Sequence, residues 1–257
     1  MTDKDLPFSQ AEFDRRIAKT RNAMEQAGLD AIFITDPSNQ NWLTAYDGWS
    51  FYVHQGVILR RDGDPIWWGR YMDMLGGRRT CWMQDENILG YGDEYVQSTE
   101  RHAMQDLANR LRDLGLEKAR IGVEMENYYY SAKAHAVLTE ELPQATLVDA
   151  TALVNWQRII KSEEEIGFIR RAARISEKVV QTALDHARPG LRKNELVAEI
   201  VHAGSTGVDE DWGDYPAIIP LTPSGLDATA AHLTWNGNEM REGEATFFEL
   251  SGVYRRY

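Results

Sequence analysis

The sequence is poor in cysteine, in long hydrophobic runs and in positive charge. Its only cysteine is Cys81, so no disulfide can form within the chain, which favours a reducing, cytoplasmic compartment. No stretch approaches the ~18 apolar residues of a membrane-spanning helix, and the first residues lack the apolar segment of a secretory signal. A disulfide-stabilised scaffold is excluded, and no membrane association is expected.

Basic residues are outnumbered, with 28 Lys and Arg against 40 Asp and Glu, which gives a net charge of -12. Nucleic acids are bound through basic surfaces, so no nucleic-acid partner is expected. The glycines form neither a GxGxxG nor a P-loop pattern, which argues against nucleotide binding. No CxxC or HExxH pattern is present, which excludes zinc sites of those types.

The first 160 residues alternate helix-type and strand-type hydrophobic patterns, which predicts an α/β domain. Expected helices cover residues 9–28, 97–114 and 131–142; expected strands cover 29–35, 57–60, 65–68 and 121–124, with a turn at 36–39. The strands at 57–60 and 65–68 flank Asp62-Gly63-Asp64, which is typical of a β-hairpin.

From residue 161 the pattern changes. Ser162 and Glu165 form a capping box that opens a long amphipathic helix, which stops before Arg188. A second helix is expected at 193–202, followed by strands at 215–221, 230–234 and 245–254, so residues 161–257 predict an α+β domain. The chain ends inside the last apolar segment, so we expect that the second domain is incomplete and truncated at Tyr257.

Four motifs of this second part resemble the creatinase/prolidase family. They are Lys161–Ile166, Tyr215–Ile219, Ser224–His232 and Glu242–Leu250. The resemblance implies a creatinase-type N-terminal domain at 1–160, followed by the first part of a catalytic domain with the pita-bread fold at 161–257. It also implies that the chain to residue 257 is by itself inactive, because the remaining catalytic residues would follow it.

Within the family, several aromatic-rich strings are similar to the branch that hydrolyses ectoine, among them Tyr46–Gln55 and Arg79–Met83. The resemblance implies a hydrolase that opens the cyclic amidine of ectoine to N-acetyl-diaminobutyrate. Glu249 stands where metal-dependent members carry their first metal-binding aspartate, and Ser251 where they carry glycine. The resemblance to this branch and to creatinase implies a metal-free site that acts on a small-molecule substrate, so we expect no metal and no other cofactor.

Other activities of the same fold remain as alternatives. One is a creatinase-like amidinohydrolase, and another is a metal-dependent Xaa-Pro dipeptidase or aminopeptidase, which would need a divalent metal. A third is a catalytically inactive domain that only binds. His232 and the lack of a basic tail argue against the last of these.

Glu249 and His232 are the predicted catalytic residues. A carboxylate binds an amidinium through charge-assisted hydrogen bonds and acts on it as a base or a nucleophile. The position of Glu249 in the motif assigns it this role, and its apolar neighbours favour a buried carboxylate over an exposed one. His232 is suited to relay a proton to the departing nitrogen, although a lone histidine is also often a hydrogen-bonded core residue.

Trp49, Tyr52, His54 and Tyr215 are the predicted substrate-binding residues. Aromatic faces attract cationic ligands, although such residues also build cores and subunit interfaces. The resemblance implies a homodimer in which the N-terminal domain of one subunit covers the active site of the other, so the segment from Trp49 to His54 would face the partner's substrate. The remaining histidines on expected helices are interpreted as surface residues: His102, His135, His186 and His202.

Overall fold

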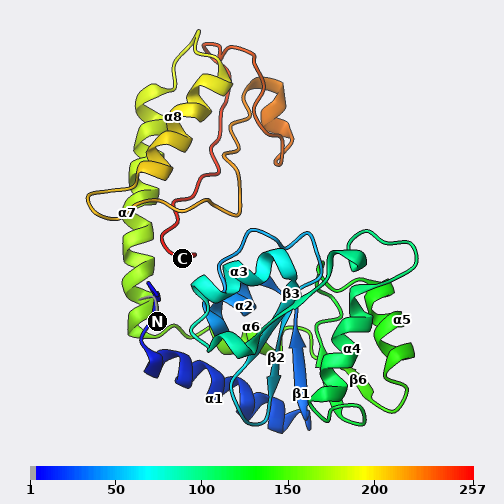
Figure 1. The fold of residues 1–257 in the computed structure, drawn as a ribbon. Coiled ribbons are helices and arrows are strands. Elements are labelled where there is room, and N and C mark those ends of the chain that lie inside the picture. The colour runs from blue at the N-terminus through cyan, green and yellow to red at the C-terminus, as the bar shows by residue number, and fades with distance from the viewer. Residues whose placement is uncertain (1–3) are drawn as a thin grey trace. The chain divides into compact units, whose positions relative to one another are not determined.

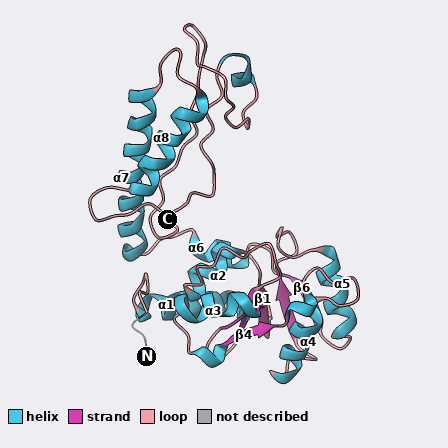
Figure 2. Cartoon of the chain, turned by 45° about the horizontal axis from the view of Figure 1, so that its top comes forward, coloured by secondary structure: helices cyan, strands magenta, loops and turns pink. Residues whose placement is uncertain are grey.

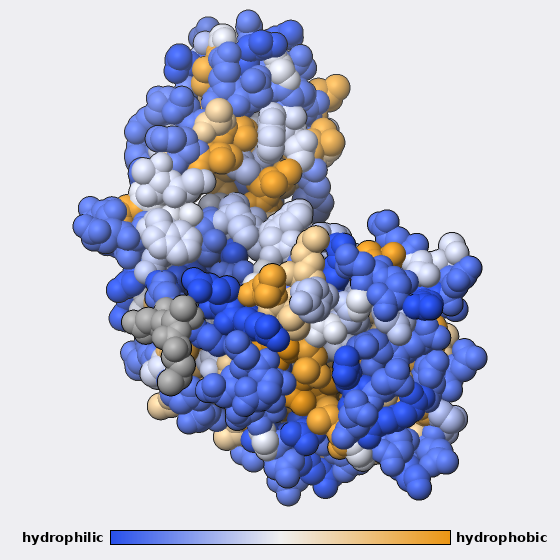
Figure 3. All heavy atoms as spheres, viewed as in Figure 1, coloured by the Kyte–Doolittle hydropathy of each residue, from blue (hydrophilic) through white to orange (hydrophobic). Residues whose placement is uncertain are grey.

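The computed structural model describes residues 4–257, which form two compact units. The first unit ends at Ile160, and the second runs from Lys161 to Tyr257. Both carry exposed hydrophobic residues within a mainly hydrophilic surface (Figure 3).

A mixed six-stranded sheet forms the centre of the first unit (Figure 1). Its strands are β1 (Ala31–Ile34), β2 (Gly56–Arg60), β3 (Ile66–Arg70), β4 (Ile88–Tyr91), β5 (Arg120–Val123) and β6 (Thr146–Asp149), in the order β4-β3-β2-β1-β5-β6. β5 pairs in parallel with both β1 and β6, so the carboxyl ends of these three strands meet at one edge. The expected hairpin is confirmed, because β2 pairs antiparallel with β3.

Helices cover both faces of this sheet (Figure 2). They are α1 (Gln10–Gln26), α2 (Pro37–Thr44), α3 (Tyr71–Thr80), α4 (Ala103–Asp113), α5 (Ala132–Glu141) and α6 (Leu153–Arg158). Short 3₁₀ turns lie at Asp85–Asn87 and Asp93–Tyr95. Ala31 and Phe33 of β1 pack in the cluster beneath α4 and α5, whereas Ile32 and Ile34 pack in the cluster beneath the other four helices. The continuous apolar run of β1 thus reflects burial on both faces.

The predicted turn at 36–39 is wrong, because α2 begins there. The Asp36 side chain accepts a hydrogen bond from the Asn39 backbone N–H, and Pro37 occupies the first helical turn. Asp followed by Pro suits a helix start as well as a turn, since the missing proline N–H is not needed at that position. The expected helix at 97–114 begins only at Ala103, where His102 provides the cap. The sequence patterns missed α3, α6, β4 and β6.

The second unit is built on two helices, α7 (Glu163–His186) and α8 (Lys193–Thr206). The predicted capping box is present, with reciprocal bonds between Ser162 and Glu165. Ile175 and Val179 of α7 pack with Leu196 and Ile200 of α8. The segment that follows α8 contains a 3₁₀ turn at Gly225–Thr229 and packs Phe248 and Leu250 against this core.

The three strands predicted after α8 are wrong as continuous strands. Leu221 and Glu249 form an isolated antiparallel bridge, and Ser224 and Thr246 form another in the same register. Pro223 lies between them and has no N–H to donate, so the ladder is interrupted. Residues 230–234 follow the 3₁₀ turn as an irregular loop.

The packing of α4 into the core of the first unit can be tested by mutation. Leu111 is 0% exposed whereas Leu75 on α3 is 56% exposed. Leu111→Ala is expected to lower the free energy of unfolding by about 2–5 kcal/mol, because it leaves a cavity in the core. Leu75→Ala is expected to change it by less than about 0.5 kcal/mol. Urea denaturation measures both, and similar values for the two variants would contradict the described packing.

Candidate functional site

The two predicted catalytic residues lie in irregular segments of the second unit. His232 is exposed in the loop that follows the 3₁₀ turn, and the Glu249 backbone pairs with Leu221. No hydrogen bond or ion pair among residues 4–257 joins the two side chains. Their catalytic roles stay predictions.

The predicted burial of Glu249 is wrong, because its side chain is exposed. The flanking Phe248 and Leu250 both pack against the α7–α8 core. In an extended segment, alternate side chains point to opposite sides, so Glu249 points away from this core. The apolar neighbours therefore indicated the buried side of the segment and not the environment of Glu249.

Tyr215 is also in the second unit and is 47% exposed. The Arg256 guanidinium lies 3.9 Å from the centroid of its ring, so a cation from within the chain already occupies this aromatic face.

The other predicted binding residues lie on the loop between α2 and β2. Trp49 and Tyr52 are each 64% exposed. The Trp49 ring contacts the rings of Phe51 and Tyr52 at centroid distances of 5.2 and 6.2 Å. Phe51 in turn contacts Tyr129, in the loop after β5, at 5.9 Å. The loop thus presents a connected group of aromatic rings rather than isolated side chains.

His54 lies at the end of the same loop, and its ring packs against that of His102 at a centroid distance of 4.7 Å. Burial, with a further contribution from His102, lowers the pKa of His54 to about 4. His102 is not the surface helix residue expected from the sequence: it is partly buried and caps α4, its Nδ1 accepting from the Met104 N–H at 3.2 Å. Burial, and secondly Lys133, lower the pKa of His102 as well. Both shifts favour the neutral imidazole.

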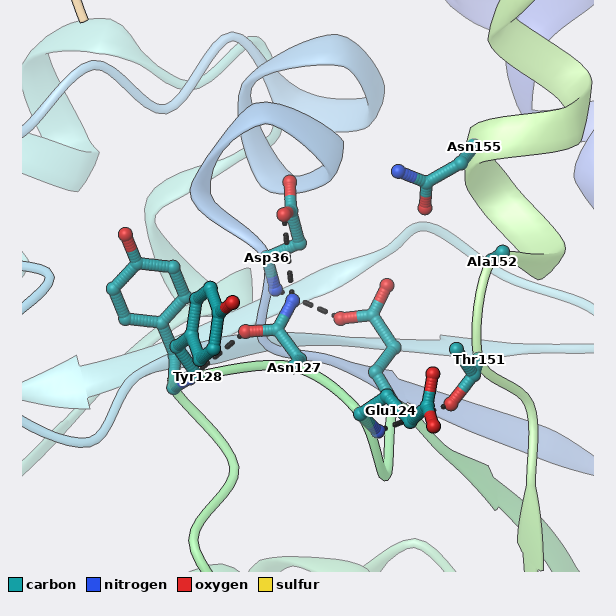
Figure 4. A pocket seen from close by; sticks show the side chains of 9 residues that line it. Asp36, Glu124, Asn127, Tyr128, Thr151, Ala152 and Asn155 are labelled. Carbon is teal, nitrogen blue, oxygen red and sulfur yellow. Dashed lines mark hydrogen bonds between the residues drawn. The ribbon is translucent and has the colours of Figure 1, made fainter. Parts of the chain in front are cut away.

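A cavity of about 220 Å³ opens where the carboxyl ends of β1, β5 and β6 meet (Figure 4). It is lined by Asp36, Glu124, Glu126, Asn127, Tyr128, Tyr129, Thr151, Ala152 and Asn155. In sheets with parallel strands, ligands commonly bind beyond the carboxyl ends of the strands. None of the predicted site residues lines this cavity. The signal that was missed is a polar residue within two positions of a strand end, Asp36 after β1 and Glu124 after β5.

Glu124 is 1% exposed, yet its carboxylate is surrounded by donors. Oε2 accepts from the backbone N–H groups of Thr35 and Asp36 at 2.7 and 2.8 Å, and Oε1 accepts from Asn39 Nδ2 at 2.7 Å. Burial raises the pKa of Glu124, while these hydrogen bonds act in the opposite direction. The carboxylate joins the end of β5 to the end of β1 and the start of α2.

Asn39 extends this connection to α6. It is 0% exposed. Its Nδ2 also donates to Asn155 Oδ1 at 2.9 Å, and its Oδ1 accepts from Arg158 Nη1 at 2.7 Å. Both oxygens of Asp36 likewise accept bonds, from the Asn39 N–H and from Asn127 Nδ2. The polar groups of the cavity wall are thus engaged with one another and primarily stabilise the loops.

Among residues 4–257, no group of three or more His, Cys, Asp or Glu side chains is arranged to hold a metal ion. This leaves the expected independence from metals untested. Within the same residues, no helix is long and apolar enough to cross a membrane.

Two family models match the chain: the creatinase/prolidase N-terminal domain over residues 16–160, and metallopeptidase family M24 over residues 167–257. The chain is 49% identical to ectoine hydrolase of Halomonas elongata, with 100% of the chain and 66% of that protein covered. It is 26% identical to creatinase of a Bacillus species, with 94% of the chain and 56% of that protein covered. The chain thus spans two thirds or less of the length of these relatives.

Solved structures show the same fold. The prolidase from Thermococcus sibiricus matches with a TM-score of 0.73 and 18% identity, covering 95% of this chain and 62% of that one. The Xaa-Pro dipeptidase from Bacillus anthracis matches with a TM-score of 0.70 and 16% identity, at the same coverage of 95% and 62%. The expected fold class is confirmed: a creatinase-type α/β domain followed by a pita-bread domain.

Because the Glu124 carboxylate joins several segments, even a substitution that keeps its volume is expected to lower stability strongly. In Glu124→Gln, the amide NH₂ must face at least one of the donors that now point at the carboxylate. We expect the free energy of unfolding to fall by about 2–3 kcal/mol, the cost of buried unpaired donors. Glu126→Gln, in the exposed part of the same loop, is the matched control and should stay within about 0.5 kcal/mol. Equal urea midpoints for the two variants would exclude the connection.

His54 predicts a dependence of stability on pH. An unfolded histidine titrates near pH 6.5, whereas folding lowers the pKa of His54 to about 4. Between these values the unfolded chain binds a proton that the folded chain does not, so stability falls as pH falls through this window. The difference in urea midpoint between pH 7 and pH 5 should be smaller in His54→Gln than in the wild type. His202→Gln, on an exposed part of α8, should leave it unchanged.

Proposed function

Since the chain belongs to the creatinase/prolidase family, we propose that it acts as a hydrolase that opens the cyclic amidine ring of ectoine to N-acetyl-diaminobutyrate. The observation that carries this proposal is the 49% identity to ectoine hydrolase, which extends over the whole chain. The similarity to creatinase is much lower, at 26%. An Xaa-Pro aminopeptidase of Escherichia coli matches only 44% of the chain, at 31% identity.

In the proposed reaction, water adds to the amidine carbon and the bond from this carbon to one ring nitrogen breaks. Glu249 binds the amidinium and acts as base toward the water, or attacks the carbon directly before water releases the product. His232 delivers the proton that the departing nitrogen needs. The exposed positions of both side chains leave them accessible to a substrate.

The family model that matches residues 167–257 is named for metallopeptidases, whose name implies a metal. Among residues 4–257, no three His, Cys, Asp or Glu side chains are grouped to hold a metal ion. The proposed steps use only the side chains of the chain itself, and their independence from a metal is part of the proposal.

We further propose that the protein is a homodimer in which Trp49 and Tyr52 of one subunit cover the substrate of the other. Their exposure and their ring contacts support this role, because exposed aromatic faces attract a cationic ring. His54 and Tyr215 remain proposed binding residues, although each already contacts another side chain, His102 and Arg256 respectively. A cytoplasmic location is proposed because the lone Cys81 is a free, buried thiol.

The test is turnover of ectoine by the protein, including any continuation of the chain beyond Tyr257. NMR would follow ectoine and N-acetyl-diaminobutyrate with a chelator present. Turnover is expected, and Glu249→Gln should reduce it by about 10²–10⁴-fold, the usual contribution of a positioned acid–base group. His232→Asn should reduce it to a similar extent.

Glu242→Gln and His202→Asn are the controls, since both side chains are exposed and lie outside the proposed machinery. If Glu249→Gln retains more than about a tenth of the wild-type turnover, its central role is wrong. If ectoine is not opened but a proline dipeptide is cleaved once manganese or cobalt is added, the metal-dependent peptidase is the correct alternative.

A further inference from the structure

The aromatic loop between α2 and β2 is anchored by three buried polar side chains. Tyr46, Ser50 and Gln55 are 4%, 3% and 4% exposed, whereas the neighbouring Trp49 and Tyr52 are each 64% exposed. Three buried polar side chains and two strongly exposed aromatic side chains thus lie within ten residues of irregular backbone. Because loops seldom bury polar groups without a reason, the anchoring residues need an explanation.

The amide oxygen of Gln55 binds the other two anchoring side chains. Gln55 Oε1 accepts from the Tyr46 hydroxyl at 3.2 Å and from the Ser50 hydroxyl at 2.9 Å. The two hydroxyl oxygens are themselves 2.8 Å apart. These contacts join the start of the loop, its middle and its last residue.

The closed loop is held against the sheet. The Tyr46 ring lies on that of Trp67 in β3, with the centroids 4.5 Å apart. Gly48 crosses directly over the Tyr46 hydroxyl, where a Cβ would lie 2.3 Å from its oxygen, so a larger residue would force the Tyr46 ring to move. Since Trp67 is 0% exposed, the anchor is part of the core, and the residues between the anchors must project outward.

Both buried hydroxyls depend on Gln55, because its amide oxygen accepts a hydrogen bond from each of them. Removing that oxygen would leave the two hydroxyls without this acceptor. The Gln55 Nε2 has no protein acceptor among residues 4–257. What the amide contributes is its carbonyl oxygen, which determines where Tyr46 and Ser50 hold the loop.

We propose that Tyr46, Ser50 and Gln55 are positioning residues that hold Trp49 and Tyr52 as a preformed aromatic surface for the cationic amidine ring of the substrate. This inference rests on the proposed function. A preformed surface avoids the cost of ordering side chains when the substrate binds. Loss of an anchor therefore weakens binding of the substrate and leaves the chemical step unchanged.

Tyr46→Phe and Gln55→Met test this role. Each removes hydrogen bonds of the anchor while keeping a side chain of similar size, and Gln55→Met also removes the unpaired donor. In ectoine turnover, both variants should raise KM by about two- to tenfold, the cost of ordering freed side chains, with kcat unchanged. Tyr71→Phe, on an exposed tyrosine of α3, is the matched control and should leave both constants unchanged.

A second readout is independent of activity. In protein labelled with 5-fluorotryptophan, ¹⁹F NMR reports the order of each of the eight tryptophans, and Trp49→Phe identifies the resonance of Trp49. Tyr46→Phe and Gln55→Met should shift and narrow that resonance as the loop becomes mobile, whereas the fluorine signals of the core tryptophans stay in place.

The outcomes separate the two proposals. A released Trp49 with unchanged KM, or a loss confined to kcat, overturns the positioning role and leaves the ectoine reaction standing. If the wild type does not open ectoine, the proposed function fails, and with it the role toward this substrate. An unchanged Trp49 resonance in both variants overturns the anchor itself, whatever the activity.

Discussion

The first unit depends on a buried carboxylate. Glu124 ends β5 inside the protein, and the backbone N–H groups that bind it belong to the start of the connection after β1. Asn39 donates to the same carboxylate and accepts from Arg158 of α6, the helix that precedes the second unit. Burying a carboxylate is costly unless its oxygens are hydrogen-bonded. The loops at this edge of the sheet must therefore adopt the conformations that supply the donors.

The surface that is proposed to meet the substrate lies at the same edge of the sheet. The loop before β2 and the loop after β5 both lie at the edge organised by Glu124, and the contact between Phe51 and Tyr129 joins them. The aromatic rings are exposed because the anchors beneath them are buried. A sheet edge with exposed aromatic side chains can bind a planar, cationic amidinium without ordering a mobile loop.

The second unit has a different character. Its stability comes from the face that α7 shares with α8, to which the irregular segment after α8 adds Phe248 and Leu250. The two proposed catalytic side chains are carried by this segment and point away from the core. Their accessibility is consistent with a role in chemistry, and the chemistry proposed for them comes from relatives of which the chain spans two thirds or less.

The sequence by itself determined the elements whose signals are local. The capping box at Ser162, the hairpin around Gly63 and the strand β1 follow from neighbouring residues, and family motifs led to the fold class and to the ectoine proposal. Only the tertiary structure decided the rest. Whether Asp36 began a turn or a helix, whether Glu249 was buried, and whether His102 was a surface residue depended on partners far away in the chain. Glu124 and Gln55 were missed for the same reason: their hydrogen-bond donors come from other elements or from a loop folded back on itself, which no linear pattern records.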